Sequence, residues 1–256
     1  PAGTWNLDES GTCEYVCDWA SDTDDCGGGD ADCDGAIDED GLGGGELCPL
    51  EDTDVVELVS ANVDYGTTYC ARRQDGSVWC WGDNQFASVS PTVNSGTPMH
   101  TPVRQPLIEA AQAVDMNSFI GAALGVSGTL WLWGAGHDGL KGDGLYNTDT
   151  FTATPLISPE TGVPFTDIAS MGLGNYHGCA RREDGTVWCW GKQSHGCLGP
   201  GGGEEPDNSW LPSPVRMTEG GDVLTGVIDV CVGGSLGCAI VASDGENTTL
   251  CWGLIF

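Results

Sequence analysis

The feature that most restricts the fold is a thirteen-residue segment that occurs twice. Residues 70–82 read CARRQDGSVWCWG, and residues 179–191 read CARREDGTVWCWG. Two further segments align with them, AALGVSGTLWLWG at 122–134 and CAIVASDGENTTLCWG at 238–253. The Trp-Gly steps of the four copies are 52, 57 and 62 residues apart, at Trp81, Trp133, Trp190 and Trp252. Strand-like repeats of this length predict a β-propeller, an all-β fold in which each repeat forms one blade.

The local pattern of each copy predicts a β-hairpin. In both near-identical copies Asp-Gly is followed by β-branched and aromatic residues, which is typical of a turn that enters a strand. If Cys70 faces Cys80, a three-residue loop that ends at Gly76 joins the two strands, and Gly76 occupies the position that needs a positive φ. The same register pairs Cys179 with Cys189.

Alternation along a strand sends the two Trp side chains of a copy to one face and the second cysteine to the other. The second copy has Ala122 and Leu132 where the cysteines would align. Both thiols are lost together, as a structural disulfide predicts. The fourth copy offers the pair Cys238 and Cys251. Each bridge closes a short loop and is expected to stabilise the fold by about 3 kcal/mol.

Thirteen cysteines are many for 256 residues, and they could bind zinc, stay reduced or form disulfides. Zinc is disfavoured because the sequence has no Cys-x-x-Cys motif and its four histidines are scattered. Disulfides in an oxidising compartment are therefore expected, and the odd total leaves at least one thiol unpaired within the chain. Two further expected pairs are Cys26 with Cys33, and Cys197 with Cys231 as a staple between the third and fourth blades. Three cysteines receive no assigned partner: Cys13, Cys17 and Cys48.

The charge excludes several classes of function. Eight Lys plus Arg against 38 Asp plus Glu give a formal net charge of −30, which repels nucleic acid phosphates. No apolar run is long enough to cross a bilayer, so membrane insertion is not expected. The acidic excess fits either solubility or a salty habitat on the one hand, or cation binding on the other.

The acidic residues also predict a domain boundary. Seventeen of the 38 lie in residues 1–54, and no Lys or Arg precedes Arg72. We therefore expect a small acidic, cysteine-rich module with its linker at 1–54 and the propeller repeats at 55–256. The repeats are expected at 55–107, 108–165, 166–226 and 227–256. The long loops at 83–107 and 192–222 are rich in Gly, Pro, Ser and Asn and are the expected places of binding.

The acidic region contains a pattern typical of a calcium loop. The segment DADCDGAID at 30–38 places oxygen ligands at loop positions 1, 3, 5 and 9 and Gly at position 6. Position 12 is Gly41 rather than Glu, so closure falls to Asp40, Glu39 or water, and the affinity should be weak. The predicted calcium ligands are Asp30, Asp32, Asp34, the Ala36 carbonyl, Asp38 and Asp40. The alternative is an acidic loop that is merely solvated.

The longer form of the repeat, GNYHGCARREDGTVWCWG at 174–191, resembles the regulator of chromosome condensation repeat in its secreted bacterial, alpha-tubulin suppressor-like form. The resemblance covers about residues 55–256. It implies a closed β-propeller of about seven repeats. It also implies protein binding, since members of this family include a secreted β-lactamase inhibitor and regulators of small GTPases.

The amino-terminal segment CGGGDADCDGAIDED at 26–40 resembles a metal-binding motif of bacterial surface proteins. The resemblance implies bound calcium and a place outside the cell or on the bacterial surface. A glycine run at 27–29 replaces the acidic first half of that motif.

The chain holds three full repeats and the start of a fourth, so the expected propeller is incomplete, with about 3.5 blades. The chain is either a fragment of a longer polypeptide, which we favour, or a subunit whose missing strands come from other chains. A propeller is stabilised by closing its ring, and three and a half blades alone would leave two sheet edges unpaired.

No catalytic motif is present. The sequence lacks a nucleophile elbow, a phosphate loop, an HExxH motif and a dinucleotide turn, so no catalytic residue is assigned and an enzyme is not expected. Two interpretations follow. The first is an extracellular or cell-surface protein-binding propeller. The alternative is a structural subunit of an extracellular filament or surface assembly that associates with copies of itself.

Overall fold

The computed structural model describes residues 4–7, 13–16 and 54–254, apart from 64–65, 87, 90–95, 97, 108, 147–149, 201–209 and 244. The chain divides into two compact units, residues 1–53 and 54–256. In the first unit, β1 (Thr4–Leu7) pairs antiparallel with β2 (Cys13–Val16). The predicted calcium ligands at 30–40, together with Cys26 and Cys33, lie outside the described residues.

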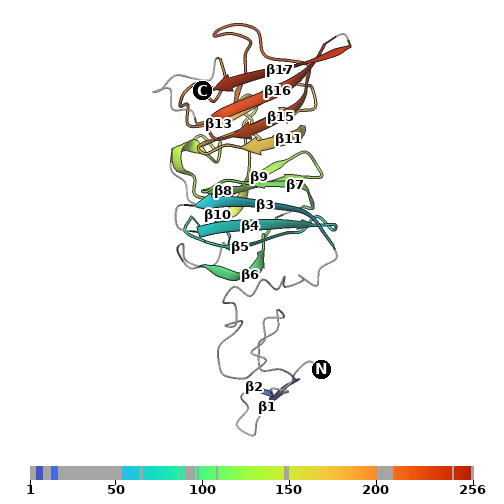
Figure 1. Ribbon diagram of the computed structural model, residues 1–256, viewed down its shortest axis with the longest axis vertical. Helices are drawn as coiled ribbons and strands as arrows, with labels where there is room; N and C mark the ends of the chain where they lie inside the picture. The colour runs from blue at the N-terminus through green and yellow to red at the C-terminus, as the bar shows by residue number, and fades with distance from the viewer. Residues whose placement is uncertain are drawn as a thin grey trace. The chain divides into compact units, whose positions relative to one another are not determined.

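The second unit consists of four antiparallel sheets that follow one another in chain order, here called blades 1 to 4 (Figure 1). Blade 1 contains β3 (Val55–Val63), β4 (Gly66–Arg73), β5 (Val78–Gly82) and β6 (Met99–Arg104). Blade 2 contains β7 (Ala111–Met116), β8 (Ile120–Gly125), β9 (Leu130–Gly134) and β10 (Thr150–Pro155). Blade 3 contains β11 (Ile168–Leu173), β12 (His177–Arg182), β13 (Val187–Gly191) and β14 (Ser213–Pro214). Blade 4 contains β15 (Val227–Gly233), β16 (Leu236–Ser243) and β17 (Glu246–Gly253).

Strand order within each sheet equals chain order, so each blade is a meander built from neighbouring segments. In the described part of the chain the only helix is the short 3₁₀ turn η1 (His137–Gly139), which lies in the loop after β9. The prediction of an all-β, blade-by-blade architecture is confirmed.

The hairpin loops have the predicted geometry. In blade 1 the Arg73 amide donates to the Ser77 carbonyl at 2.9 Å, and the Gly76 amide donates to the Arg73 carbonyl at 2.9 Å. Gly76 has a φ of 77°, the left-handed value expected at the end of a three-residue hairpin loop. In blade 3 the same position is Gly185, with a φ of 79°.

The three disulfides of the hairpins also form. Because the turn fixes the register, the two cysteines of a copy stand directly opposite each other on adjacent strands. The bridges are Cys70–Cys80, Cys179–Cys189 and Cys238–Cys251. In blade 2 the opposed residues are Ala122 and Leu132, both completely buried.

The glycine of the Trp-Gly step is required by its backbone conformation. In blade 2 Gly134 has a φ of 106°, and a Cβ at this position would collide with the Phe119 carbonyl oxygen. The equivalent glycines have φ values between 100° and 105°, at Gly82, Gly191 and Gly253. This turn directs the chain out of the third strand of each blade.

Neighbouring blades pack through two different faces of their sheets. We call the face that carries the Trp side chains the Trp face, and the opposite one the Cys face. One core cluster joins Cys70 and Cys80 of blade 1 to Ala123 and Trp133 of blade 2. The Cys face of one blade therefore packs on the Trp face of the next. The same arrangement recurs at the other two interfaces. Trp190 of blade 3 packs on blade 2, and Trp252 of blade 4 packs on blade 3.

Candidate functional site

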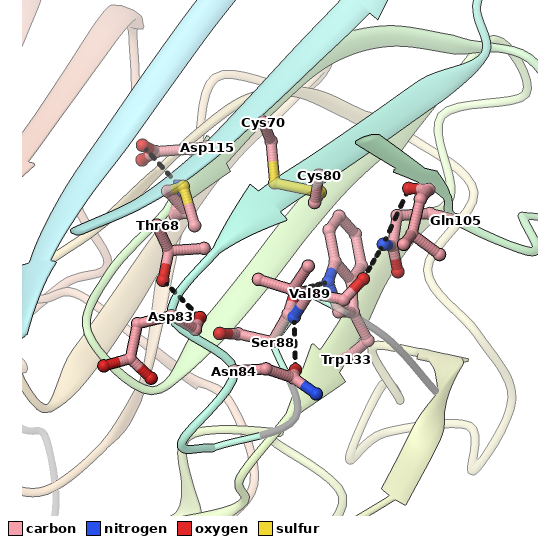
Figure 2. Close-up of a disulfide and its surroundings, with 12 residues drawn as sticks. Thr68, Cys70, Cys80, Asp83, Asn84, Ser88, Val89, Gln105, Asp115 and Trp133 are labelled. Carbon is pink, nitrogen blue, oxygen red and sulfur yellow. Dashed lines mark hydrogen bonds between the residues drawn. A yellow bond between two sulfur atoms is a disulfide. The ribbon is translucent and has the colours of Figure 1, made fainter. Parts of the chain in front are cut away.

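A hydrogen bond from the repeated Trp fixes each loop that follows a third strand. The Trp133 indole N–H of blade 2 donates to the Ser88 carbonyl of blade 1 at 2.8 Å, beside the Cys70–Cys80 bridge (Figure 2). The next two interfaces repeat this bond, from Trp190 to the Leu140 carbonyl at 2.8 Å and from Trp252 to the Cys197 carbonyl at 3.0 Å. Each acceptor lies six residues after the glycine of the preceding Trp-Gly step. The loops at this end of the blades are therefore held in equivalent positions.

A second repeated bond joins the blades at the opposite ends of the strands. The Ala111 amide at the start of blade 2 donates to the Gly76 carbonyl in the hairpin loop of blade 1, at 2.8 Å. The bonds from Ile168 to Gly128 and from Val227 to Gly185 are equivalent, each at 3.0 Å. Each interface is thus fixed at both ends, which makes the array a defined platform for surface side chains.

Blade 1 departs from the repeat at one position of its Trp face. In blades 2 to 4 the residue opposite the Trp of the Trp-Gly step is a glycine. The indole ring lies over this glycine, as Trp133 lies over Gly121. In blade 1 the opposite residue is Tyr69, which stacks on Trp81 with ring centroids 5.6 Å apart. Tyr69 is 36% exposed, so this aromatic pair lies at the surface of the described unit.

Six aromatic side chains gather at the ends of blades 1 to 3 where the indole bonds hold the loops. We call them the aromatic patch: Phe86, Phe119, His137, Tyr146, Tyr176 and Trp210. Phe119 lies at its centre, in the β7–β8 turn, with its ring centroid 4.8 Å from Phe86 of blade 1 and 5.3 Å from Tyr176 of blade 3. A row of rings thus crosses two blade interfaces.

The loop after β9 extends the aromatic patch. His137 meets both Phe86 and Phe119 edge to face, with centroids 6.0 Å apart in each case. Two residues further on, Gly139 packs against the Trp210 ring, which lies 5.2 Å from Tyr146. The loops of blades 2 and 3 meet here.

The aromatic patch combines apolar area with polar groups. Tyr146 is 54% and Tyr176 39% exposed. The Lys192 ammonium lies 5.7 Å above the Tyr176 ring and 3.6 Å from an Asp138 carboxylate oxygen. Tyr and Trp are enriched at protein interfaces, where their rings contribute contact area. This chemistry favours binding by packing and stacking.

Sequence reasoning found only part of this site. The loops at 83–107 and 192–222, expected to bind, supply Phe86 and Trp210 respectively. It missed Phe119 and Tyr176, which occupy the short turns between the first and second strands of blades 2 and 3. The available signal was an aromatic residue directly before each second strand. The segment around His137 lies in the loop after β9, where His137–Gly139 form η1.

The predicted bridge between Cys197 and Cys231 is wrong. Cys197 is buried, and its thiol donates to the Lys192 carbonyl at 3.0 Å. Burial raises the pKa of this thiol. Cys231 is exposed on β15, where its register partner is Cys238. The loop that carries Cys197 packs on Trp252 through the indole bond, and both thiols remain unbridged.

Within the described ranges, no cluster of three or more His, Cys, Asp or Glu side chains is arranged to hold a metal ion. Among the same residues, no helix has the length and apolar character needed to cross a membrane. The calcium prediction rests on residues 30–40, which these statements do not cover.

Comparison with known proteins identifies the repeat. The description "Regulator of chromosome condensation (RCC1) repeat" matches residues 65–87 and 166–197, and a second form of the same repeat matches residues 184–240. These matches include the near-identical segments of blades 1 and 3.

Three relatives show the extent of the similarity. The human probable E3 ubiquitin-protein ligase HERC6 is 34% identical over 93 residues, which are 36% of this chain and 8% of that protein. The mitochondrial RCC1 domain-containing protein RUG3 of Arabidopsis thaliana is 32% identical, over 55% of this chain and 32% of its own length. The mouse RCC1-like G exchanging factor-like protein is 28% identical, over 64% and 35%. The chain spans about a third or less of the length of these relatives.

Two solved structures share the fold. Human WBSCR16 superposes with a TM-score of 0.56 at 20% identity, over 74% of this chain and 45% of that one. Prp20p of Saccharomyces cerevisiae also has a TM-score of 0.56, at 22% identity over 71% and 42%. The chain therefore carries regulator of chromosome condensation repeats at residues 65–87 and 166–240, and its four stacked sheets share the fold of these solved structures.

Proposed function

We propose that this chain is a non-catalytic protein-binding propeller module that works outside the cell or on the surface of a bacterium. The aromatic patch carries the proposal. It gathers rings from three blades, partly exposes two tyrosines, and rests on loops that the indole bonds hold in place. A preformed aromatic surface loses little conformational entropy on binding, which favours affinity.

The comparisons and the disulfides support two parts of this proposal. A Prp20p structure was described with that protein's binding to Gsp1p and histones, and another structure contains yeast RCC1 bound to Kap60. We infer from this fold relationship that the present chain also binds proteins. Three disulfides favour an oxidising compartment. The net charge of −30 favours a partner whose facing surface is basic or apolar.

The test is site-specific photo-crosslinking. The full chain carries p-benzoylphenylalanine in place of Phe119, and a matched control carries it in place of Val163. Phe119 is half-buried, and Val163 is exposed. Val163 follows β10, whose end lies beside Trp131, away from Gly134 and the aromatic patch. Each variant is irradiated with extracellular and surface proteins of the source organism.

The proposal expects a discrete crosslinked protein from position 119 that position 163 does not give. Equal crosslinking from both positions, or none from position 119, would contradict binding at the aromatic patch.

We further propose that residues 30–40 bind calcium weakly through the oxygen ligands that their spacing predicts. Binding should order residues 20–45 and protect them from proteolysis. Limited proteolysis with and without a chelator tests this. Cleavage that does not change on chelation would remove the metal from the proposal.

We rank the alternative, a subunit of an extracellular assembly, below the binding module. Among the described residues nothing covers the Trp face of blade 1, where Leu58 is 61% exposed, and this favours the assembly. However, a blade that packs like the others needs a glycine under its indole, and blade 1 has Tyr69. Sedimentation velocity of the non-reduced chain distinguishes the two. The binding module predicts a compact species near 26.6 kDa, and large particles would favour the assembly.

A further inference from the structure

Blade 4 carries three cysteines in one row across its strands. Cys231 on β15 stands opposite Cys238 on β16, and Cys238 stands opposite Cys251 on β17. Cys238 and Cys251 are bridged, and Cys231 is free. The residues equivalent to Cys231 in the other bridged blades are Val59 and Gly172, so only blade 4 places a thiol beside its own disulfide.

The row is accessible in the described unit. The other four bridged cysteines are completely buried because the next blade covers them. On blade 4 no described residue covers the Cys face, and both Cys231 and Cys251 are exposed. Within these residues the free thiol and the bridge lie on the same face of blade 4.

The register also sets the distance between the thiol and the bridge. The Cα atoms of Cys238 and Cys251 are 4.1 Å apart, the narrow type of antiparallel pair whose backbone groups point away from each other. The N–H and C=O groups of Cys238 therefore face β15, and its pair with Cys231 is the wide type, with Cα atoms about 5.5 Å apart. This separation lies within the roughly 4.4 to 6.8 Å that disulfides span. Directly opposed side chains also share one face of the sheet.

We propose that Cys231, Cys238 and Cys251 form a thiol–disulfide exchange site. The Cys231 thiolate attacks the Sγ atom of Cys238, a new Cys231–Cys238 bond forms, and the Cys238–Cys251 bond breaks. Cys251 leaves as a thiolate and takes up the proton that Cys231 released. The number of disulfides does not change, so the step needs no external oxidant or reductant.

The straight row suits this displacement. Cys231 approaches Cys238 from the side opposite Cys251, which is the direction of an in-line attack on the bridge. The exchange moves the free thiol from the inner strand β15 to β17. The chain thus has two disulfide isomers that present a reactive thiol at different places on one surface.

The test maps the bridges of the full, non-reduced chain. The protein is held at pH 8 without added thiol, quenched in acid and alkylated, then cleaved after Leu236 and Glu246 so that each cysteine of the row lies on its own peptide. Mass spectrometry should find two species: alkylated Cys231 with the Cys238–Cys251 bridge, and alkylated Cys251 with a Cys231–Cys238 bridge. If only the first species is found, the proposal is overturned.

Two variants control for access. Cys231→Ser should reduce alkylation of Cys251 at least tenfold, because the attacking thiol is gone. Cys197→Ser, which removes the buried thiol of blade 3, should leave the alkylation of Cys251 unchanged. Unchanged alkylation of Cys251 in Cys231→Ser would show that another thiol opens the bridge, against the proposal.

A third variant tests the geometry alone. In Cys251→Ser the proposal expects a Cys231–Cys238 bridge after oxidation with glutathione disulfide. Two alkylated thiols in this variant, in a chain that still folds by circular dichroism, would show that the pair cannot bridge and would overturn the proposal.

Discussion

Acidification should destabilise the fold through His177, the first residue of β12. Its side chain is 1% exposed and packs against Gly174, and its Nε2 atom has no hydrogen-bond partner among the described residues. Burial without a partner disfavours the charged imidazole and lowers the pKa of His177 from 6.5 to about 4. The His177 side chain therefore contributes mainly by packing.

The sign of the effect follows from proton binding. The pKa is lower in the folded chain, so the unfolded chain binds more protons between pH 6.5 and pH 4. Stability that is complete at neutral pH is lost as the pH falls through this window. A shift of this size corresponds to about 3 kcal/mol below pH 4 and to about 2 kcal/mol at pH 5.

The assay compares urea unfolding, followed by Trp fluorescence, at pH 7 and pH 5. Many carboxylates also titrate with acid, so the informative quantity is the difference between the wild type and His177→Gln. The wild type should lose about 2 kcal/mol more than this variant between the two pH values. His195→Gln, a substitution at an exposed histidine, should behave like the wild type. Equal pH dependence in the wild type and His177→Gln would refute the reasoning.

Two further substitutions test the contacts that build the array. Trp190→Phe removes the indole N–H that satisfies a buried carbonyl, so the free energy of unfolding should fall by about 1 to 3 kcal/mol. Trp81→Phe removes no such described bond and should cost clearly less, and equal losses would contradict the role of the indole bond. Replacing Cys179 by Ala and Cys189 by Leu copies the apolar pair of blade 2 and should cost at most about 3 kcal/mol. A chain as stable as the wild type in urea would show that this bridge adds nothing.

The sequence was sufficient for features that depend on residues close in the chain. The bridge Cys70–Cys80 joins residues ten positions apart, and a turn with Gly76 at positive φ fixes their register. Position along the chain was not sufficient for contacts between blades. Cys197 and Cys231 lie near the same blade boundary, but Cys197 packs in the core cluster on the Trp face of blade 4, and Cys231 is exposed on the opposite face.

The aromatic patch could not be predicted for the same physical reason. Phe119 lies 33 residues from Phe86 and 57 from Tyr176, and only the stacking of blades brings their rings together. A single repeat shows an aromatic residue directly before its second strand, but it does not show which rings of the other repeats lie beside that residue. The repeat pattern predicts the platform, and its surface chemistry depends on the assembled blades.

The most direct test of the account is the affinity of the crosslinked partner for two double variants of the full chain. Phe119→Ser with Tyr176→Ser disrupts the centre of the aromatic patch, while Val126→Ser with Val163→Ser changes two exposed apolar residues elsewhere. The account predicts that the first pair weakens Kd by tenfold or more, about 1.4 kcal/mol, and that the second leaves it unchanged. An unchanged Kd for the first pair, or an equal loss for both, would contradict binding through the aromatic patch.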